Sequence, residues 1–426
     1  MAGARGRATP TRTPPRSSSP APRTEAVVPP DWDSAVSTVS SHPTPPVVVV
    51  CGPKNSGKHG KVAYLDTDVG QPEFGPPGCL SFHVLDEAIV DLMNPSLREA
   101  ERCKISPLIC YLHTEVLIVV WCYFFGDISS KRDPEAYLNC LFHSYDYFVG
   151  KYRCDENEML PLIVNTPGWV KGAGFDMLVE MLRYICPTIV VQIRITIKNK
   201  NLPDGGFWLD GGQTGPMMIN IDAAFHDASN RSLLIQKDSC GMRERRLVEY
   251  LKQCFPSNIS LSTNKELAYA LASLPPYQVP FSDVAIVHLH CKVPAGEIWH
   301  SLNATIVGLA VSNASEGTRS IPYCVGLGII RGVDIQKGLL YLITPVPLQR
   351  LQSVDLLQQG LIEIPTALLQ VTTCSPHPPF DFLFWSADVC RPTCRRMCFT
   401  RYLKGICMLG DVGAGSVRDR PVFAGF

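Results

Sequence analysis

An uninterrupted run of five apolar residues, Val47–Cys51, is followed at once by a glycine-containing loop that ends in lysine. Such a run predicts a strand buried on both faces, which is typical of a parallel sheet. The loop fits the P-loop pattern, in which backbone N–H groups wrap phosphate oxygens and a lysine reaches the β- and γ-phosphates. We therefore expect a nucleotide site formed by Gly52, Pro53, Lys54, Asn55, Ser56, Gly57 and Lys58.

Two features of this loop depart from the pattern. The residue after Lys58 is His59, where the pattern has a Ser or Thr whose hydroxyl binds Mg²⁺. An imidazole nitrogen is a poor ligand for that hard cation. Only residues 59–61 separate the loop from the next apolar run, Val62–Leu65. A crossover between parallel strands needs about a dozen residues or more, so the helix that would help to hold the phosphates has no room.

Apolar runs alternate with helical patterns over residues 47–275. Asp133, Pro134 and Glu135 supply an N-cap, a first-turn proline and a first-turn acid, so a helix is expected to follow them. This alternation predicts an α/β fold, a parallel sheet with helices on both faces. The remaining predicted elements are strands at Val47–Cys51, Val62–Leu65, Leu160–Asn165 and Ile189–Ile193, and a helix at Phe175–Ile185.

Residues 276–371 show a different pattern, in which short β-rich segments are separated by Gly, Pro and Asn. We expect a smaller β-rich C-terminal domain there. Its predicted strands are Val284–His290, Asn303–Val311, Gly326–Ile330 and Leu339–Ile343.

The two ends of the chain lack a regular pattern. Residues 1–46 are rich in Pro, Ser and Arg, and we expect a disordered tail, with an organellar transit peptide as the alternative. Residues 372–426 form a Cys/Arg-rich tail, in which Cys390, Cys394 and Cys398 are spaced four apart, a spacing that favours free thiols over zinc. Lys+Arg and Asp+Glu are equal at 39 each, which excludes a polycation, and no membrane-spanning helix is expected.

Polar residues follow two of the predicted strands. Asp66 and Asp68 end the second strand, and alternation along a strand would place both carboxylates on one side. Beside a P-loop they can bind Mg²⁺ through water or accept a proton from an attacking hydroxyl. Thr166, Pro167 and Gly168 follow a third strand, at the sheet edge where open α/β folds bind ligands. An acidic turn and a simple Thr-Pro-Gly turn are the structural alternatives.

This set of motifs resembles the polynucleotide 5′-hydroxyl kinase family, and most of all its nucleolar branch, which acts in pre-rRNA processing. The resemblance implies a kinase that uses ATP and Mg²⁺ to phosphorylate RNA 5′-hydroxyl ends, with an endoribonuclease partner, in the nucleolus. It spans about residues 47–371 and rests on Gly52–Lys58, Asp66–Gln71, Thr166–Trp169, Tyr64–Pro77, Gly326–Asp334 and Leu339–Pro347.

The resemblance also implies roles for individual residues. Asp68 would be the catalytic carboxylate, with Asp66 and Gln71 beside it. Thr166 and Gly168 would clasp the P-loop lysine. A lid would supply Arg243 and Arg246 to the transferring phosphoryl group, ahead of a helix expected over Leu247–Phe255.

Three breaks in the family pattern suggest an altered chain. The crossover after Lys58 is about fifteen residues short, Lys104–Cys122 is an insertion expected to lie outside the core, and the end after Val371 diverges. We therefore expect an impaired kinase, with a catalytically dead scaffold as the alternative. A GTPase is disfavoured because Leu202 stands where the base-reading acid belongs.

Overall fold

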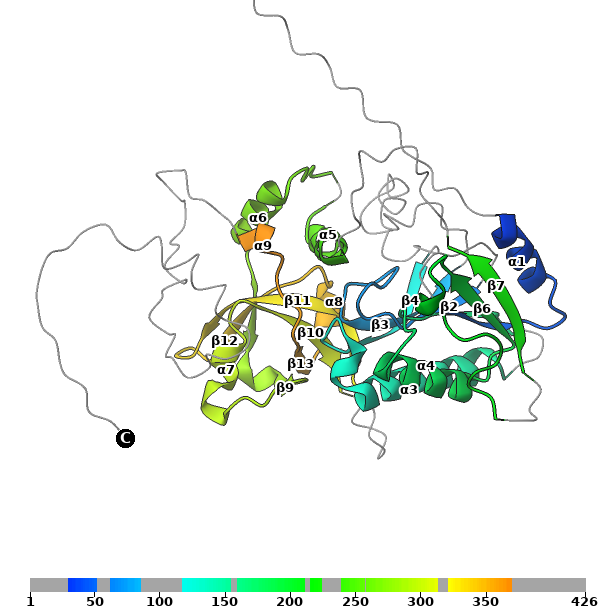
Figure 1. The fold of residues 1–426 in the computed structure, drawn as a ribbon. Helices are drawn as coiled ribbons and strands as arrows, with labels where there is room; N and C mark the ends of the chain where they lie inside the picture. The colour runs from blue at the N-terminus through cyan, green and yellow to red at the C-terminus, as the bar shows by residue number, and fades with distance from the viewer. Residues whose placement is uncertain are drawn as a thin grey trace, which may run out of the picture. The chain divides into compact units, whose positions relative to one another are not determined.

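The computed structural model describes residues 30–51, 62–85, 117–154, 159–210, 215–223, 239–256, 258–312 and 321–369 (Figure 1). The predicted phosphate loop, the short crossover after it and the Cys/Arg-rich tail lie outside these residues. Among the helices described, none is long and apolar enough to cross a membrane.

A seven-stranded sheet forms the first half of the molecule, in the order β4-β3-β2-β5-β1-β6-β7. The five strands from β2 to β7 in that order run parallel, whereas β3 is antiparallel to β2 and β4 to β3. The predicted α/β sheet is confirmed, and β3, β4 and β7 are added to it. The strands are β1 (Val47–Cys51), β2 (Val62–Asp66), β3 (Cys79–Leu85), β4 (Leu117–Phe124), β5 (Leu162–Asn165), β6 (Ile189–Arg194) and β7 (Met217–Asp222).

Two helices, α3 (Pro134–Tyr152) and α4 (Ala173–Ile185), cover one face of this sheet. The carboxylate of Asp133 accepts a hydrogen bond from the Ala136 N–H at 3.0 Å, so α3 begins with the predicted cap. Both helices bury an apolar stripe against the strands, and this layer forms the largest core cluster.

The opposite face carries α1 (Pro30–Ser40), which contradicts the expectation of disorder up to residue 46. Trp32 is buried in α1 among strand residues of β1, β6 and β7, and its indole N–H donates to the Asp222 carbonyl at 2.7 Å. Asp31 accepts from the Asp222 N–H at 2.6 Å. The apolar stripe that α1 buries is short, Trp32, Ala35 and Val39, and it lies within a segment otherwise rich in Pro, Ser and Thr, so the prediction missed it.

Strand β4 overturns part of a second expectation. We expected Lys104–Cys122 to lie outside the core, but Leu117–Cys122 form most of β4 and pair with β3, with Ser81 opposite Cys122. The rest of that segment lies outside the described residues. A run rich in β-branched and aromatic residues pairs readily with an open sheet edge, which explains the difference.

A six-stranded sheet, in the order β8-β12-β11-β10-β13-β9, forms the second half. Its neighbours are antiparallel except β13 and β9, and it has its own apolar core. The predicted β-rich pattern is confirmed here. The strands are β8 (Tyr277–Pro280), β9 (Ala285–His288), β10 (Thr305–Val311), β11 (Tyr323–Asp334), β12 (Leu339–Ile343) and β13 (Leu356–Gln359).

In the part of the chain that the structure describes, five further helices accompany this sheet: α5 (Ser239–Lys252), α6 (Asn264–Ser273), α7 (Ile298–Ser301), α8 (Leu348–Leu351) and α9 (Thr366–Leu369). The helix expected over Leu247–Phe255 thus begins earlier, at Ser239. The arginines that were placed ahead of it lie inside α5 instead.

The two sheets contact each other at the residues that directly follow β4. The Leu361 N–H donates to the Gly126 carbonyl at 2.6 Å, and the His290 ring bonds the Phe125 carbonyl at 2.6 Å. A Cβ atom at Gly360 would lie 2.3 Å from the Gly126 carbonyl oxygen, so the backbones approach too closely for any side chain there. These contacts hold the second sheet against the end of β4, which is an edge strand of the first sheet.

Candidate functional site

Three neighbouring parallel strands end at one edge of the first sheet. Strand β5 lies between β2 and β1, with Asn165 in register with Asp66 on one side and Val50 on the other. The predicted phosphate loop begins immediately after β1. Because the carboxyl ends of parallel strands lie at the same edge, β2 and β5 present their terminal polar residues at the edge where that loop starts, with β5 next to β1 and β2 one strand further away.

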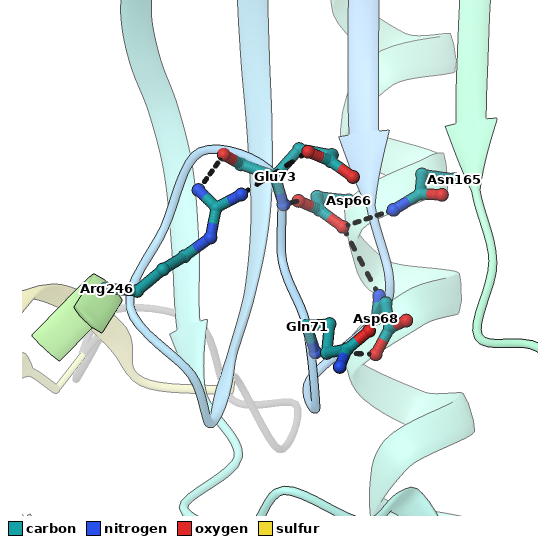
Figure 2. A network of polar contacts seen from close by, with 6 residues as sticks. All are labelled: Asp66, Asp68, Gln71, Glu73, Asn165 and Arg246. Carbon is teal, nitrogen blue, oxygen red and sulfur yellow. Dashed lines mark hydrogen bonds and ion pairs between the residues drawn. The ribbon is translucent and has the colours of Figure 1, made fainter. Parts of the chain in front are cut away.

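Asp66 is fully buried, and the protein holds both of its carboxylate oxygens (Figure 2). Oδ1 accepts from the Asn165 side-chain amide at 2.9 Å, and Oδ2 accepts from the Glu73 N–H at 2.5 Å. A carboxylate with both oxygens so engaged organises the loop that follows β2. Neither Asn165 nor Glu73 was predicted as part of the site.

Asp68 lies in the turn beyond the end of β2, so the expectation that strand alternation aligns it with Asp66 is wrong. Its Oδ1 accepts the N–H groups of Gly70 and Gln71, both at 2.9 Å, and its own N–H lies 3.4 Å from Asp66 Oδ1. The Asp68 side chain therefore shapes a tight turn around itself, and Gln71 lies within that turn (Figure 2).

The Thr-Pro-Gly-Trp turn is tied to the strands on both sides. The Thr166 hydroxyl donates to the Val50 carbonyl at 2.9 Å, one residue before β1 ends, and Thr166 is buried. Gly168 is exposed. Trp169 packs edge-on against Tyr137 at 5.4 Å between ring centroids, and the Tyr137 hydroxyl donates to the Thr67 carbonyl at 2.7 Å.

Arg246 reaches the same site from α5. Its guanidinium donates to the Glu73 carbonyl and forms an ion pair with the Glu73 carboxylate, at 3.4 Å between Nη2 and Oε2. Arg243, one turn earlier on α5, is half-buried. Glu73 also bonds Asp66, so the structure links Arg246 to the aspartate motif through Glu73. Arg246 and Glu73 are 173 residues apart in sequence.

Burial changes the acidity of the side chains around this edge. Desolvation raises the pKa of Tyr64 well above its usual value, and the nearby Asp66 and Glu73 carboxylates add to the shift. Desolvation also raises the pKa of Tyr137, and it raises that of the Cys51 thiol at the end of β1 to about 12. These groups stay protonated at neutral pH, so Cys51 offers no thiolate nucleophile.

Seven predicted site residues, Gly52, Pro53, Lys54, Asn55, Ser56, Gly57 and Lys58, lie outside the described residues. Among the residues that the structure does describe, no group of three or more His, Cys, Asp or Glu side chains could hold a metal ion by itself.

Two protein-family models match the chain. Residues 54–204 match the P-loop of the mRNA cleavage and polyadenylation factor CLP1, and residues 272–365 match the NOL9-like C-terminal domain. A chain in a solved structure of an extended Pcf11p–Clp1p interface has the same fold at a TM-score of 0.53 and 17% identity, over 78% of each chain. A chain of a wild-type Clp1p–Pcf11p complex gives 0.50 at 16% identity, over 78% of this chain and 77% of that one.

Curated relatives agree with these matches. The polynucleotide 5′-hydroxyl-kinase NOL9 of Arabidopsis thaliana is 46% identical over 364 residues, covering 81% of this chain and 93% of that protein. The Danio rerio NOL9 kinase is 30% identical over 76% of this chain but only 47% of its own length, so the chain spans about half of this vertebrate relative. Grc3 of Schizosaccharomyces pombe is 32% identical over 37% of this chain and 21% of its own. Because the similarity covers most of the chain and includes both matched domains, the chain belongs to the NOL9 family of polynucleotide 5′-hydroxyl-kinases.

Proposed function

We propose that this protein is an ATP-dependent kinase that phosphorylates RNA 5′-hydroxyl ends during pre-rRNA processing, on internal transcribed spacer cleavage products. The observation that carries the proposal is the edge where β1, β2 and β5 end together. There, Asp66 and Asp68 follow β2, and β5 alone separates β2 from β1, the strand that leads into the predicted phosphate loop. The relatives' shared name, polynucleotide 5′-hydroxyl-kinase, supports the reaction class.

Each residue at this edge has a role in the proposal. Lys58 and the backbone N–H groups of Gly52 and of Lys54–Gly57 would hold the ATP phosphates, since Pro53 has no N–H. Asp68 would accept the proton of the attacking RNA hydroxyl, and Asp66 would hold the turn that presents it. Mg²⁺, when bound with ATP, would neutralise charge on the phosphates, and Asp66 and Asp68 are carboxylates of the kind that bind it through water.

The remaining site residues would position groups and stabilise charge. Thr166, whose hydroxyl is bonded to the end of β1, would fix the Thr-Pro-Gly turn against the P-loop lysine, with Gly168 and Gln71 as close neighbours of the nucleotide. Arg243 and Arg246 would stabilise the charge that spreads over the transferring phosphoryl oxygens.

We further propose that this chain, with its short crossover after Lys58, is impaired in kinase activity. Strands β1 and β2 both run parallel to β5, and only residues 52–61 join them. A parallel crossover with a helix needs about a dozen residues or more, and Lys58 leaves three before Val62. His59 also removes the magnesium-binding hydroxyl. Loss of a single electrostatic donor costs about 10²–10³ in rate, and two contributions are reduced here.

The resemblance in sequence motifs also implies a partner and a location. We propose an endoribonuclease partner of the pre-rRNA processing machinery. We also propose a nucleolar location, and the NOL9 name of the relatives supports the location. The second candidate is a catalytically dead scaffold, and the short connection between β1 and β2 favours it.

The test is transfer of labelled γ-phosphate from ATP to a 5′-hydroxyl RNA oligonucleotide, with a 5′-phosphorylated oligonucleotide as the negative control. The chain as written is compared with a crossover-restored chain, in which His59→Ser is combined with a family-length helix inserted before Lys61. We expect the restored chain to transfer phosphate. We expect the original chain to transfer it at a rate at least about 10²-fold lower. Equal activity would refute the impairment argument, and no activity in either would favour the scaffold.

A further inference from the structure

We propose that Glu73 is a positioning residue that ties the lid arginine Arg246 to the Asp66 carboxylate. This inference rests on the proposed kinase function, because it concerns how the arginine is placed for phosphoryl transfer. Neither the P-loop pattern nor the family resemblance assigned Glu73 a role.

Glu73 contacts both Asp66 and Arg246 (Figure 2). The Glu73 N–H donates to Asp66 Oδ2 at 2.5 Å, while its carbonyl accepts from Arg246 Nη1. Its carboxylate adds the ion pair with Arg246 Nη2 at 3.4 Å. A displacement of Arg246 would therefore be transmitted to Asp66 through the backbone of a single residue, Glu73.

The surroundings favour a persistent contact. The side chains of Arg246 and Glu73 are 22% and 18% exposed, so solvent and salt screen this ion pair less than they would a surface pair. Arg246 makes two contacts to Glu73, one to backbone and one to side chain, and a guanidinium with several fixed partners loses little further freedom when a substrate arrives.

Helix α5 is also fixed one turn later. The Tyr250 hydroxyl accepts from the Leu327 N–H at 2.7 Å and lies 3.1 Å from the Leu327 carbonyl, to which it donates. The helix is thus anchored on β11 of the second sheet while Arg246 extends to the loop after β2. Glu73 determines where the guanidinium lies relative to the site, and the Tyr250 contact determines where the helix lies.

Such placement matters for a group that acts only in the transition state. An arginine that stabilises the transferring phosphoryl group lowers the barrier without binding the RNA more tightly, so its displacement should lower kcat and leave KM for RNA unchanged. A misplacement of about 1 Å can cost about 10²-fold in rate.

The experiment uses the full-length crossover-restored chain and the variant Glu73→Gln, which keeps the backbone bonds and removes the carboxylate charge. Glu249→Gln is the matched control, because it removes the same charge from a glutamate on α5 whose ion pair is with Lys252, at 2.8 Å on the same helix. We expect Glu73→Gln to lower kcat about 10- to 100-fold with KM for the RNA within about twofold, and Glu249→Gln to match the parent.

A second comparison separates positioning from a purely structural role. If Glu73 acts through Arg246, adding Glu73→Gln to Arg246→Ala should cause no further loss of kcat, and thermal melting should show all variants folded. Two outcomes would overturn this inference and leave the kinase proposal standing. In the first, the parent transfers phosphate and Glu73→Gln has the same kcat. In the second, the separate losses of kcat multiply in the double variant. A parent without transfer would overturn the kinase proposal, and this inference with it.

Discussion

The side-chain amide of Asn165 donates to Asp66 Oδ1 at 2.9 Å, so the last residue of β5 holds the last residue of β2. The bond crosses between neighbouring parallel strands at the edge where the proposed site lies. It leaves the Asp66 carboxylate fully buried, with its other oxygen bonded to the Glu73 N–H. Asp66 and Asp68 share one short motif but have different proposed roles. Asp66 organises the loop after β2, and Asp68 would accept the proton of the RNA hydroxyl.

Asp66→Asn and Asp68→Asn should have distinct consequences. At position 66 an amide would place an NH₂ group against the Asn165 or Glu73 donor, and we expect about 1–3 kcal/mol lower free energy of unfolding. At position 68 we expect a smaller loss of stability but at least a 10²-fold lower rate in the crossover-restored chain. Urea unfolding and phosphate transfer, measured on both variants, check this. Equal stability losses would contradict the assignment of Asp66 as the organising residue.

Lys58→Ala should abolish ATP binding to the chain, as measured by isothermal titration calorimetry. The lysine is the one cation that the loop pattern directs at the β- and γ-phosphates. Lys171→Ala, which removes the same charge from an exposed position, is the control. Unchanged ATP affinity in Lys58→Ala would show that Gly52–Lys58 is not the phosphate-binding loop.

Two deletions should separate strand β4 from the segment before it. Removal of residues 104–122 takes away most of β4 and leaves β3, which still pairs with β2, as an open edge strand, so we expect insoluble protein or loss of a cooperative melting transition. Removal of residues 104–116 spares β4 and should keep that transition. Soluble expression and thermal melting of both proteins decide the matter. A cooperative transition in the longer deletion would show that β4 contributes little to the fold.

His83 should make stability depend on pH. It is fully buried in β3, where desolvation lowers its pKa from 6.5 to about 3. Between these values the unfolded chain binds the proton and the folded chain does not. The free energy of unfolding should therefore fall as pH decreases from about 6.5 toward 3, by up to about 1.4 kcal/mol per pH unit.

The variant His83→Phe isolates this contribution, since it keeps a ring beside Phe74 and removes the titrating group. We expect a smaller loss of stability between pH 6.5 and 4.5 than in the parent, measured by urea unfolding. His300→Phe, at an exposed position, is the control. Identical pH slopes for His83→Phe and the parent would contradict the proposed titration.

The sequence by itself determined the elements that carry a local signal. Val47–Cys51 is apolar throughout because a central parallel strand is covered on both faces, and the structure has β1 with those bounds. Helix α3 begins where Asp133 and Pro134 cap it, because capping depends only on neighbouring residues. The parallel arrangement then required the ends of β1, β2 and β5 to meet at one edge.

Only the tertiary structure decided which distant groups contact one another. Trp32 anchors α1 on β7, and Arg246 bonds Glu73 across 173 residues of sequence. No local pattern encodes such pairs, because each partner alone is an ordinary aromatic or charged side chain. Their contacts depend on how sheets and helices pack, and that packing is set by the summed burial of many residues rather than by any short segment.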